Sequence, residues 1–556
     1  MKIRKIVNIA LAAVLSCNVW AIGAGCSGIG DDQRTNPGAS QTLNIGYFNG
    51  GVTSEWLREM EKEYEKANPD VEILINSELK DEIKNQKLLA DIENRNEDIF
   101  FAHEISYQEF VNRGLIADIT DVVTNPAAEG EDTVENRMVD TLQEKYEIDG
   151  KYYAVPFYTN FTGAIYDVDL FEEKSLYIAK DGGYTSGLEG QPEKSYGKDG
   201  VPNTYDDGLP VTFDEYKSWL NYMSRTRGVI PYIWCTDDSY RIGYLDSLVA
   251  GYEGENDYRL NYTLEGTLRD GTSVTPEDAY LLRESDGVKF ALEMAKVIIS
   301  NRYYHTDSIN GQITHIDAQN KFLRSRKDNK PIAMILEGGW WENEARATFD
   351  SLGANNEKYA YGNRRFAYMP VPQYNSGANE GETYYCSSAG VAVLINANTK
   401  QLDLAKDFLK FTLTEHAMST FTKHVGIARP YQYDLEEGVY ESLTPFGRNF
   451  WDIVSTDMSE KEENTETNAT EEPAKEGARN ICYVGDGHAF LKNTTYFGTY
   501  EWRYGAEIGG KKYVEPFLVF LNQKDTTAAQ YLQGMKDRYP ADEYKAEYNR
   551  WLASQK

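Results

Sequence analysis

The stretch DGKYYAVPFYTNFTGAIYDVDLFE, residues 149–172, decides the fold. It begins with Asp149-Gly150, a dipeptide typical of a tight turn, set between two short runs that predict a β-hairpin. Pro156 lacks the N–H group that a central strand donates, so the second strand stops there. The polar Tyr158-Thr159-Asn160 follows, and a new strand begins at Thr162. A chain that ends one strand, exposes polar residues and starts another strand is expected to cross between two sheets.

The length and charge of the chain restrict its class. A chain of 556 residues is too long for one ordinary hydrophobic core, so two lobes or domains are expected. Its 88 acidic residues outnumber the 57 basic ones and give a formal charge of −31. Phosphate binding needs a basic surface, so this balance argues against a nucleic-acid partner.

The N-terminus has the pattern of a secretory signal, predicted to cover residues 1–25. Three basic residues precede an apolar run over residues 6–24, which ends in small residues. No other stretch approaches the roughly 20 uninterrupted apolar residues of a membrane span. An uncleaved anchor helix is the alternative interpretation.

A lipid attachment site is expected at the end of this signal. Gly23-Ala24-Gly25-Cys26 resembles a bacterial lipobox, with Gly23 at the place where Leu is usual. Cys26 would then carry lipid, and residues 26–41, which are polar and contain Gly and Pro, would form a flexible tether. Cys17 is the rival lipidation site.

Cysteine usage in the body of the chain is sparse. Cys235, Cys386 and Cys482 form an odd set without CxxC spacing, which is neither a disulfide scaffold nor a zinc site. One disulfide among the three is compatible with this set, but its pairing cannot be read from the sequence.

The first hundred residues after the tether predict a parallel sheet. Strands are expected at residues 42–48, 71–75 and 98–102, separated by helices, and such a βαβ series has right-handed crossovers. Ligands bind beyond the carboxyl ends of such strands. Two strand-end segments meet this rule, Tyr47-Phe48-Asn49 and His103-Glu104.

Two polar inserts interrupt the pattern, at about residues 174–210 and 456–480. The first contains a turn-rich loop, residues 198–208, with several oxygen-bearing side chains. Calcium takes six to eight oxygen ligands, and this loop could provide them. The candidate ligands are Asp199, Asn203, Asp206 and Asp207. EF-hand spacing is absent, and a solvated loop without metal is the alternative.

The opening stretch resembles a known protein family. Gly150, Tyr153, Pro156 and Ile165 match a Gly-x-x-Tyr/Trp-x-x-Pro crossover followed by an aliphatic strand. This pattern is similar to that of the bacterial extracellular solute-binding proteins of ATP-driven importers, in particular the sugar-binding, maltose-binding-protein-like family.

The resemblance extends from about residue 42 to residue 553, apart from the two inserts. Residues 366–372 resemble the second crossover of the family, an aromatic-x-Pro-x-Pro segment. Residues 402–411 match a helix across the first lobe, residues 426–430 match the loop after it, and residues 526–535 resemble the closing helix.

The resemblance implies an α/β fold of the two-lobe periplasmic-binding-protein type, type II-like, with several crossovers and a cleft between the lobes. It assigns residues 42–154 and 373–429 to the N-terminal lobe. Residues 155–372 and 430–556 fall to the C-terminal lobe.

A sugar-binding cleft needs aromatic platforms and planar polar groups, because sugars offer C–H faces and hydroxyls. The strand-end loops near the expected crossovers supply such side chains. The candidate ligand-binding residues are Tyr47, Asn49, Glu104, Tyr158, Asn160, Trp234, Asp237, Glu337, Trp340, Trp341, Ser388 and Arg429.

The strongest candidate is the run Gly338-Gly339-Trp340-Trp341, which follows a strongly predicted strand and Glu337. Paired glycines let the backbone approach a ligand. In the family, Gly-x-Trp at this place often stacks the Trp on a sugar ring, and the doubled Trp leaves open whether Trp340 or Trp341 does so.

Other candidates have structural alternatives. Tyr158 could pack at a hinge instead of touching ligand, and Trp234 follows an apolar run and could be a core residue. Glu104 and Asp237 could be ordinary loop carboxylates. Arg429 could hold a sugar hydroxyl or a carboxylate between the lobes.

No motif for catalysis is present. Histidine is scarce, with six residues, and HExxH, GxSxG and GxxxxGK[ST] are all absent. The resemblance implies a non-enzymatic, monomeric protein that captures a carbohydrate and delivers it to a membrane permease. It would be lipid-anchored at the outer face of a bacterial membrane and need no cofactor. The alternatives are a non-transport glycan-capture or sensor protein, and an importer subunit for another solute such as a peptide.

Overall fold

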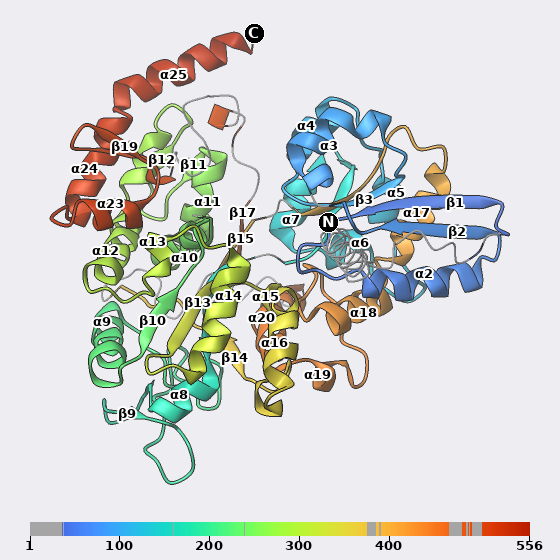
Figure 1. Cartoon of the computed structure of the whole chain (residues 1–556). Coiled ribbons are helices and arrows are strands. Elements are labelled where there is room, and N and C mark those ends of the chain that lie inside the picture. The colour runs from blue at the N-terminus through green and yellow to red at the C-terminus, as the bar shows by residue number, and fades with distance from the viewer. Residues whose placement is uncertain are drawn as a thin grey trace, which may run out of the picture.

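The computed structural model describes most of the chain. The described residues are 36, 38–79, 81–159, 161–237, 239–374, 385–388, 391–465, 481–484, 488, 490–491 and 503–555. Two separate sheets, each covered by helices, divide them into two lobes (Figure 1). Of the described residues, those within 38–156 and 391–433 form the N-lobe, and those within 162–388 and 439–555 form the C-lobe. The predicted signal, Cys26 and its tether lie outside the described residues.

The N-lobe sheet has five strands in the order β2-β1-β3-β16-β6. These strands are β1 (Gln41–Tyr47), β2 (Val71–Asn76), β3 (Ile99–Ala102), β6 (Ala154–Pro156) and β16 (Ala392–Ile395). The first three are parallel, which confirms the predicted βαβ series, and β16 runs antiparallel to both of its neighbours. The carboxyl ends of β1 and β3 therefore lie at one edge of the sheet.

Helices cover this sheet with apolar faces at helical spacing. In α2 (Glu55–Ala67), Trp56, Met60 and Tyr64 recur at helical spacing and are buried. Between β2 and β3, α3 spans Asn85–Asp91 between 3₁₀ turns. α17 (Leu402–Phe411) has the predicted bounds, and α18 (Glu415–Val425) follows it.

The C-lobe sheet has four strands in the order β10-β13-β7-β14. They are β7 (Thr162–Asp167), β10 (Ile230–Ile233), β13 (Ile332–Gly338) and β14 (Phe366–Tyr368). β10 and β13 are parallel, whereas β7 is antiparallel to β13 and β14. The carboxyl end of β13 therefore lies at the opposite edge from the carboxyl end of β7.

Several helices make up the rest of the C-lobe. They include α9 (Phe213–Asn221), α10 (Ser239–Glu253), α12 (Asp286–Ser300), α14 (His315–Arg324), α20 (Pro445–Thr465), α24 (Ala528–Arg538) and α25 (Ala541–Ser554). Thr212 starts α9 with a capping box to Glu215. No helix among the described residues is long and apolar enough to span a membrane.

The predicted hairpin and crossover are both present. Asp149 and Gly150 have φ values of 52° and 74°, which suits a tight turn between β4 (Glu147–Ile148) and β5 (Lys151–Tyr152). After Pro156 the chain leaves the N-lobe sheet and enters the C-lobe sheet at Thr162. Pro156 still pairs with Ala392, so the N-lobe sheet extends two residues beyond the boundary expected at Ala154.

The second and third crossings between the lobes lie beside the first crossing. Phe157 N–H donates to the carbonyl of Val391 at 3.1 Å, and Thr159 N–H donates to the carbonyl of Ala428 at 2.9 Å. Before the second crossing, Gln373 exchanges backbone hydrogen bonds with residues 211 and 213 of the C-lobe. Gln373 is therefore joined to the C-lobe by its backbone.

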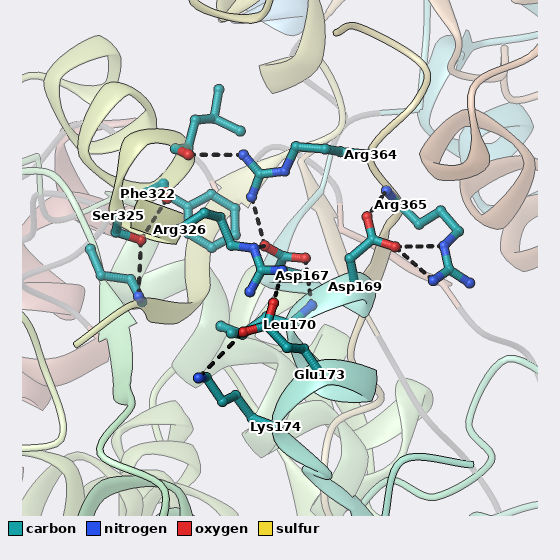
Figure 2. A network of polar contacts seen from close by, with 12 residues as sticks. Asp167, Asp169, Leu170, Glu173, Lys174, Phe322, Ser325, Arg326, Arg364 and Arg365 are labelled. Carbon is teal, nitrogen blue, oxygen red and sulfur yellow. Dashed lines mark hydrogen bonds and ion pairs between the residues drawn. The ribbon is translucent and has the colours of Figure 1, made fainter. Parts of the chain in front are cut away.

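A buried ion-pair network anchors the C-lobe sheet where β7 ends (Figure 2). Asp167 is fully buried and accepts from the N–H of Leu170, which caps α8 (Val168–Lys174). Its Oδ2 lies 2.6 Å from Arg364 Nη2 and 3.4 Å from Arg326 Nε. The charge of Asp167 is therefore matched by two arginines and by the start of a helix.

Candidate functional site

The two lobes touch where β13 ends. Trp340 and α15 (Trp341–Glu344) follow this strand directly. Asn343 Nδ2 donates to the carbonyl of Gly51 at 3.1 Å and to that of Val425 at 2.8 Å. Gly51 lies in the loop after β1, and Val425 ends α18. The strand-end loops of both sheets thus meet at one place, as the sequence predicts.

Glycines at this junction make room for protein side chains. A Cβ on Gly51, which has a φ of 76°, would lie 2.8 Å from Trp340 Cβ and 2.9 Å from Glu344 Cγ. A Cβ on Gly338 would lie 2.3 Å from the Trp340 ring, and one on Gly339 would lie 2.6 Å from Phe450. In this structure, side chains of the protein therefore occupy the space beside these glycines.

The two adjacent tryptophans have different environments. Trp340 is half-buried at the junction between the lobes. Trp341 is fully buried, with ring centroids 4.9–6.0 Å from the rings of four phenylalanines, Phe322, Phe349, Phe366 and Phe446. Of the pair, Trp340 is the one that can present a ring face to a ligand, and Trp341 belongs to the core.

Two acidic side chains lie beside Trp340, the buried Glu337 and the half-buried Glu344. Gln319 of α14 donates through Nε2 to Glu337 Oε1 at 3.0 Å and to Glu344 Oε2 at 2.9 Å. Glu337 is 1% exposed, and its pKa is raised well above the ordinary value by burial and then by the charge of Glu344. Among the described residues, no lysine or arginine forms an ion pair with Glu337. Both carboxylates are hydrogen-bond acceptors held in place by an amide.

Two tyrosines complete this acidic cluster. Burial raises the pKa of Tyr240, and the charges of Glu337 and Glu344 raise it further. Burial, Glu344 and Glu104 raise the pKa of Tyr158, a residue of the first crossover. Tyr158 is 4% exposed and its ring lies 5.1 Å from that of Phe157, so in this structure it packs at the hinge.

The remaining exposed candidates lie around this cluster. Asp237 is exposed and accepts from the N–H and hydroxyl of Ser239 at the start of α10. Glu104 is exposed in the left-handed region at φ 56°, and the hydrogen bond from His103 lowers its pKa. Asn49 is half-buried in the loop after β1.

The structure places three candidates in the core instead. Tyr47 is fully buried, and its hydroxyl donates to Thr53 and accepts from Trp56. Trp234 is 1% exposed and packs on Tyr304 and Phe517. These rings cannot stack on a ligand in this conformation.

Arg429 is the third of these core residues. Its Nε donates to the carbonyl of Phe157 at 3.0 Å and its Nη1 to that of Thr412 at 2.6 Å. Because it is fully buried, Arg429 ties the first crossover to the third and does not reach a ligand. Asn160 lies outside the described residues, and of Ser388 only the backbone is described, paired with Val484.

The predicted calcium loop is held together by its own backbone. Asp206 is buried and accepts from the N–H groups of Lys198 and Asp199. Asp207 accepts from the N–H of Asn203 at 2.7 Å. Among the described residues no group of three or more His, Cys, Asp or Glu is arranged to hold a metal ion. The predicted ligand set is thus not assembled here.

Gln319, Tyr240 and Glu344 were not predicted from the sequence. Tyr240 follows the candidate loop after β10, and Glu344 is seven positions after Glu337, so both lie near predicted residues in the sequence. Gln319 lies on α14, before β13, and no local pattern marks it.

An open cavity of about 740 Å³ lies elsewhere, on the N-lobe. Its lining contains no aromatic residue and comprises Ala117, Asp118, Thr120, Asp121, Thr124, Asn125, Ala397, Leu402 and Lys406.

The family model described as bacterial extracellular solute-binding protein matches residues 59–433. No curated protein matches the sequence.

Solved structures with the same fold are numerous. RafE in complex with raffinose is 15% identical, with a TM-score of 0.53 over 89% of this chain and 99% of RafE. The apo form of RafE from Streptococcus pneumoniae is 15% identical, with a TM-score of 0.54 over 90% and 99%. GacH of Streptomyces glaucescens, solved unliganded and with acarbose, is 17% identical, with a TM-score of 0.52 over 90% and 97%. These similarities support the two-lobe α/β fold.

Proposed function

The chain belongs to the bacterial extracellular solute-binding proteins, and from this we propose that it captures an oligosaccharide between its lobes for import. The observation that carries the proposal is the placement of Trp340 beside the Glu337–Gln319–Glu344 cluster, where strand ends of both lobes meet. The crystallised relatives bound to raffinose and acarbose support an oligosaccharide as the ligand.

The chemistry of this cluster suits an uncharged sugar. Sugar hydroxyls donate hydrogen bonds, and carboxylates accept them strongly. The C–H face of a sugar ring packs on an indole ring such as that of Trp340. An anionic ligand would meet the negative charge of Glu104, Asp237 and Glu344, which opposes its binding.

Binding is coupled to movement of the lobes in this proposal. Segments of both lobes line the junction, so a ligand bound there contacts both lobes when they close. Such a ligand binds the closed conformation more tightly than the open one and therefore favours the closed conformation. The three crossings, tied by Arg429 and by backbone hydrogen bonds, form the hinge. The closed form would dock on a membrane permease, with Cys26 lipid and a flexible tether keeping the protein at the outer face of the membrane.

A thermal-shift screen followed by calorimetry tests the proposal. We expect neutral oligosaccharides such as raffinose, acarbose or chitin oligosaccharides to raise the melting temperature, because a ligand of the folded state stabilises it. Acidic oligosaccharides and short peptides serve as the comparison. Stabilisation by peptides alone would favour a non-sugar importer subunit.

Site variants then assign the binding residues. Trp340→Ala should weaken binding of the best sugar, whereas Trp340→Phe, which keeps an aromatic face, should retain most of it. Unchanged affinity in Trp340→Ala would remove Trp340 from the site. Normal sugar uptake in cells that lack the protein would favour the glycan-capture or sensor alternative.

A further inference from the structure

Two cysteines that are far apart in the sequence lie opposite each other in a small parallel sheet. β15 (Tyr385–Ser388) pairs with β17 (Ile481–Val484), and the register places Cys386 directly beside Cys482. Neighbouring strands are about 4.8 Å apart, which falls in the range of about 4.4–6.8 Å between Cα atoms that a disulfide spans. Residues that pair in register also have their side chains on the same face of the sheet.

The two thiols are in contact in the structure. Burial raises the pKa of Cys482, and a hydrogen bond with the Cys386 thiol raises it further. Cys482 is fully buried, whereas Cys386 is half-buried. Cys386 is thus partly accessible to solvent, whereas Cys482 is not.

This two-stranded sheet lies at the hinge between the lobes. Ser387 pairs with Phe161, at the end of the first crossover. The hydroxyls of Thr159 and Tyr483 are 3.1 Å apart, and Cys386 N–H donates to Ser247 of α10 at 3.1 Å. Residues 387–481 between the two cysteines include the whole return through the N-lobe, from β16 to α18.

We propose that Cys386 and Cys482 form a disulfide that fastens β17 to the hinge and closes residues 387–481 into a covalent loop. Disulfides form in extracytoplasmic compartments, where this family is located. The inference does not depend on which ligand the protein binds.

The oxidation proceeds by thiol–disulfide exchange with an external disulfide, such as that of an oxidoreductase or oxidised glutathione. The Cys386 thiolate attacks this disulfide, forms a mixed disulfide and releases one external thiol. The Cys482 thiolate then attacks the Cys386 sulfur and releases the second external thiol. The two cysteines lose two protons and two electrons, and the external disulfide is reduced to two thiols.

Peptide mapping of the secreted full-length protein tests the proposal. The protein is alkylated without reduction, digested and analysed by mass spectrometry. We expect a linked peptide pair that contains Cys386 and Cys482, and an alkylated Cys235. Alkylation of both Cys386 and Cys482 after equilibration with oxidised glutathione would overturn the proposal, and this readout needs no variant.

Thermal unfolding gives an independent test. Dithiothreitol should lower the apparent melting temperature of the natural protein by about 3–8 °C, because the closed loop restricts the unfolded chain. Cys386→Ser and Cys482→Ser should unfold at this lower temperature with or without reductant. Cys235→Ser is the matched control, because Cys235 is buried and its nearest sulfur contact is the carbonyl of Asp237. It should keep the response to reductant, and loss of that response only in Cys235→Ser would contradict the pairing.

Discussion

Two carboxylates are buried at opposite edges of the C-lobe sheet, and their surroundings differ. Asp167 ends β7, is fully buried and faces Arg364 and Arg326. Glu337 lies near the end of β13, is 1% exposed and receives hydrogen bonds from Gln319 and from its neighbour's N–H. The nearest charge that acts on Glu337 is another carboxylate, that of Glu344.

The two environments give these acidic residues different roles. Asp167 has a structural role, whereas Glu337 remains available to a ligand. A carboxylate that is matched by two arginines and a helix start has its acceptor capacity filled. A carboxylate held by an amide alone keeps capacity for further donors, and its burial without a cation costs stability. Glu337 lies at the strand-end edge where α/β proteins bind ligands, whereas Asp167 lies at the other edge.

The largest effect is expected for Asp167→Ala. This variant leaves two buried arginines without their partner and removes the cap of α8, so the free energy of unfolding should fall by about 4–6 kcal/mol. Denaturant unfolding measures it. Asp169→Ala is the control, because Asp169 pairs with the 43% exposed Arg365 and should cost about 1 kcal/mol or less. Equal losses in the two variants would contradict the structural role of Asp167.

Trp340 and Trp341 show the same contrast between a residue available to a ligand and a structural residue. Trp341→Ala leaves a cavity among four phenylalanines and should lower the free energy of unfolding by about 3–5 kcal/mol. Trp340→Ala should cost less stability, because its ring is half-buried, and should mainly weaken sugar binding. Denaturant unfolding and calorimetry of both variants compare the two effects. A larger stability loss in Trp340→Ala would reverse their assigned roles.

Glu342 is a third buried acidic residue of the C-lobe. Its Oε2 accepts from the Thr444 hydroxyl at 2.6 Å, and burial raises its pKa to about 7. Between about pH 4.5 and pH 7 the folded protein holds this proton and the unfolded chain loses it, so stability falls as pH rises through this window.

Glu342→Gln should therefore flatten the pH dependence of stability. Relative to the natural protein, the variant should gain up to about 3 kcal/mol between pH 4 and pH 8, since a glutamine never ionises. Unfolding at several pH values checks this. Parallel curves for the two proteins would mean that Glu342 titrates normally.

The sequence predicts the fold well because fold signals are local. Asp149-Gly150, Pro156 and the apolar strands mark the crossover and both sheets by turn chemistry and periodicity. Strand order follows from the βαβ rule for β1 to β3.

The site was predicted only in part, because side-chain orientation depends on packing across the chain. Trp340 and Trp341 are adjacent and chemically identical, and only the phenylalanine cage separates their roles. Arg429 has the composition of a ligand clamp but is buried against carbonyls from distant segments. Gln319 reaches the site from a helix whose sequence gives no indication of it.

The smallest of these effects, and the one closest to function, is expected for Glu337→Gln. A glutamine of similar shape cannot ionise, and burial already disfavours the charged form of Glu337, so stability at neutral pH should be unchanged or higher. The glutamine replaces one oxygen of Glu337 with an NH2 group, which removes an acceptor for a sugar hydroxyl, so affinity should fall by about 0.5–1.5 kcal/mol, roughly 2- to 13-fold. Calorimetry with the best neutral oligosaccharide measures this, and Asp237→Asn, at the exposed rim, serves as the control with a smaller loss. If Glu337→Gln lowers stability as Asp167→Ala does and leaves affinity intact, then both edges of the sheet hold structural charges and the ligand is bound elsewhere.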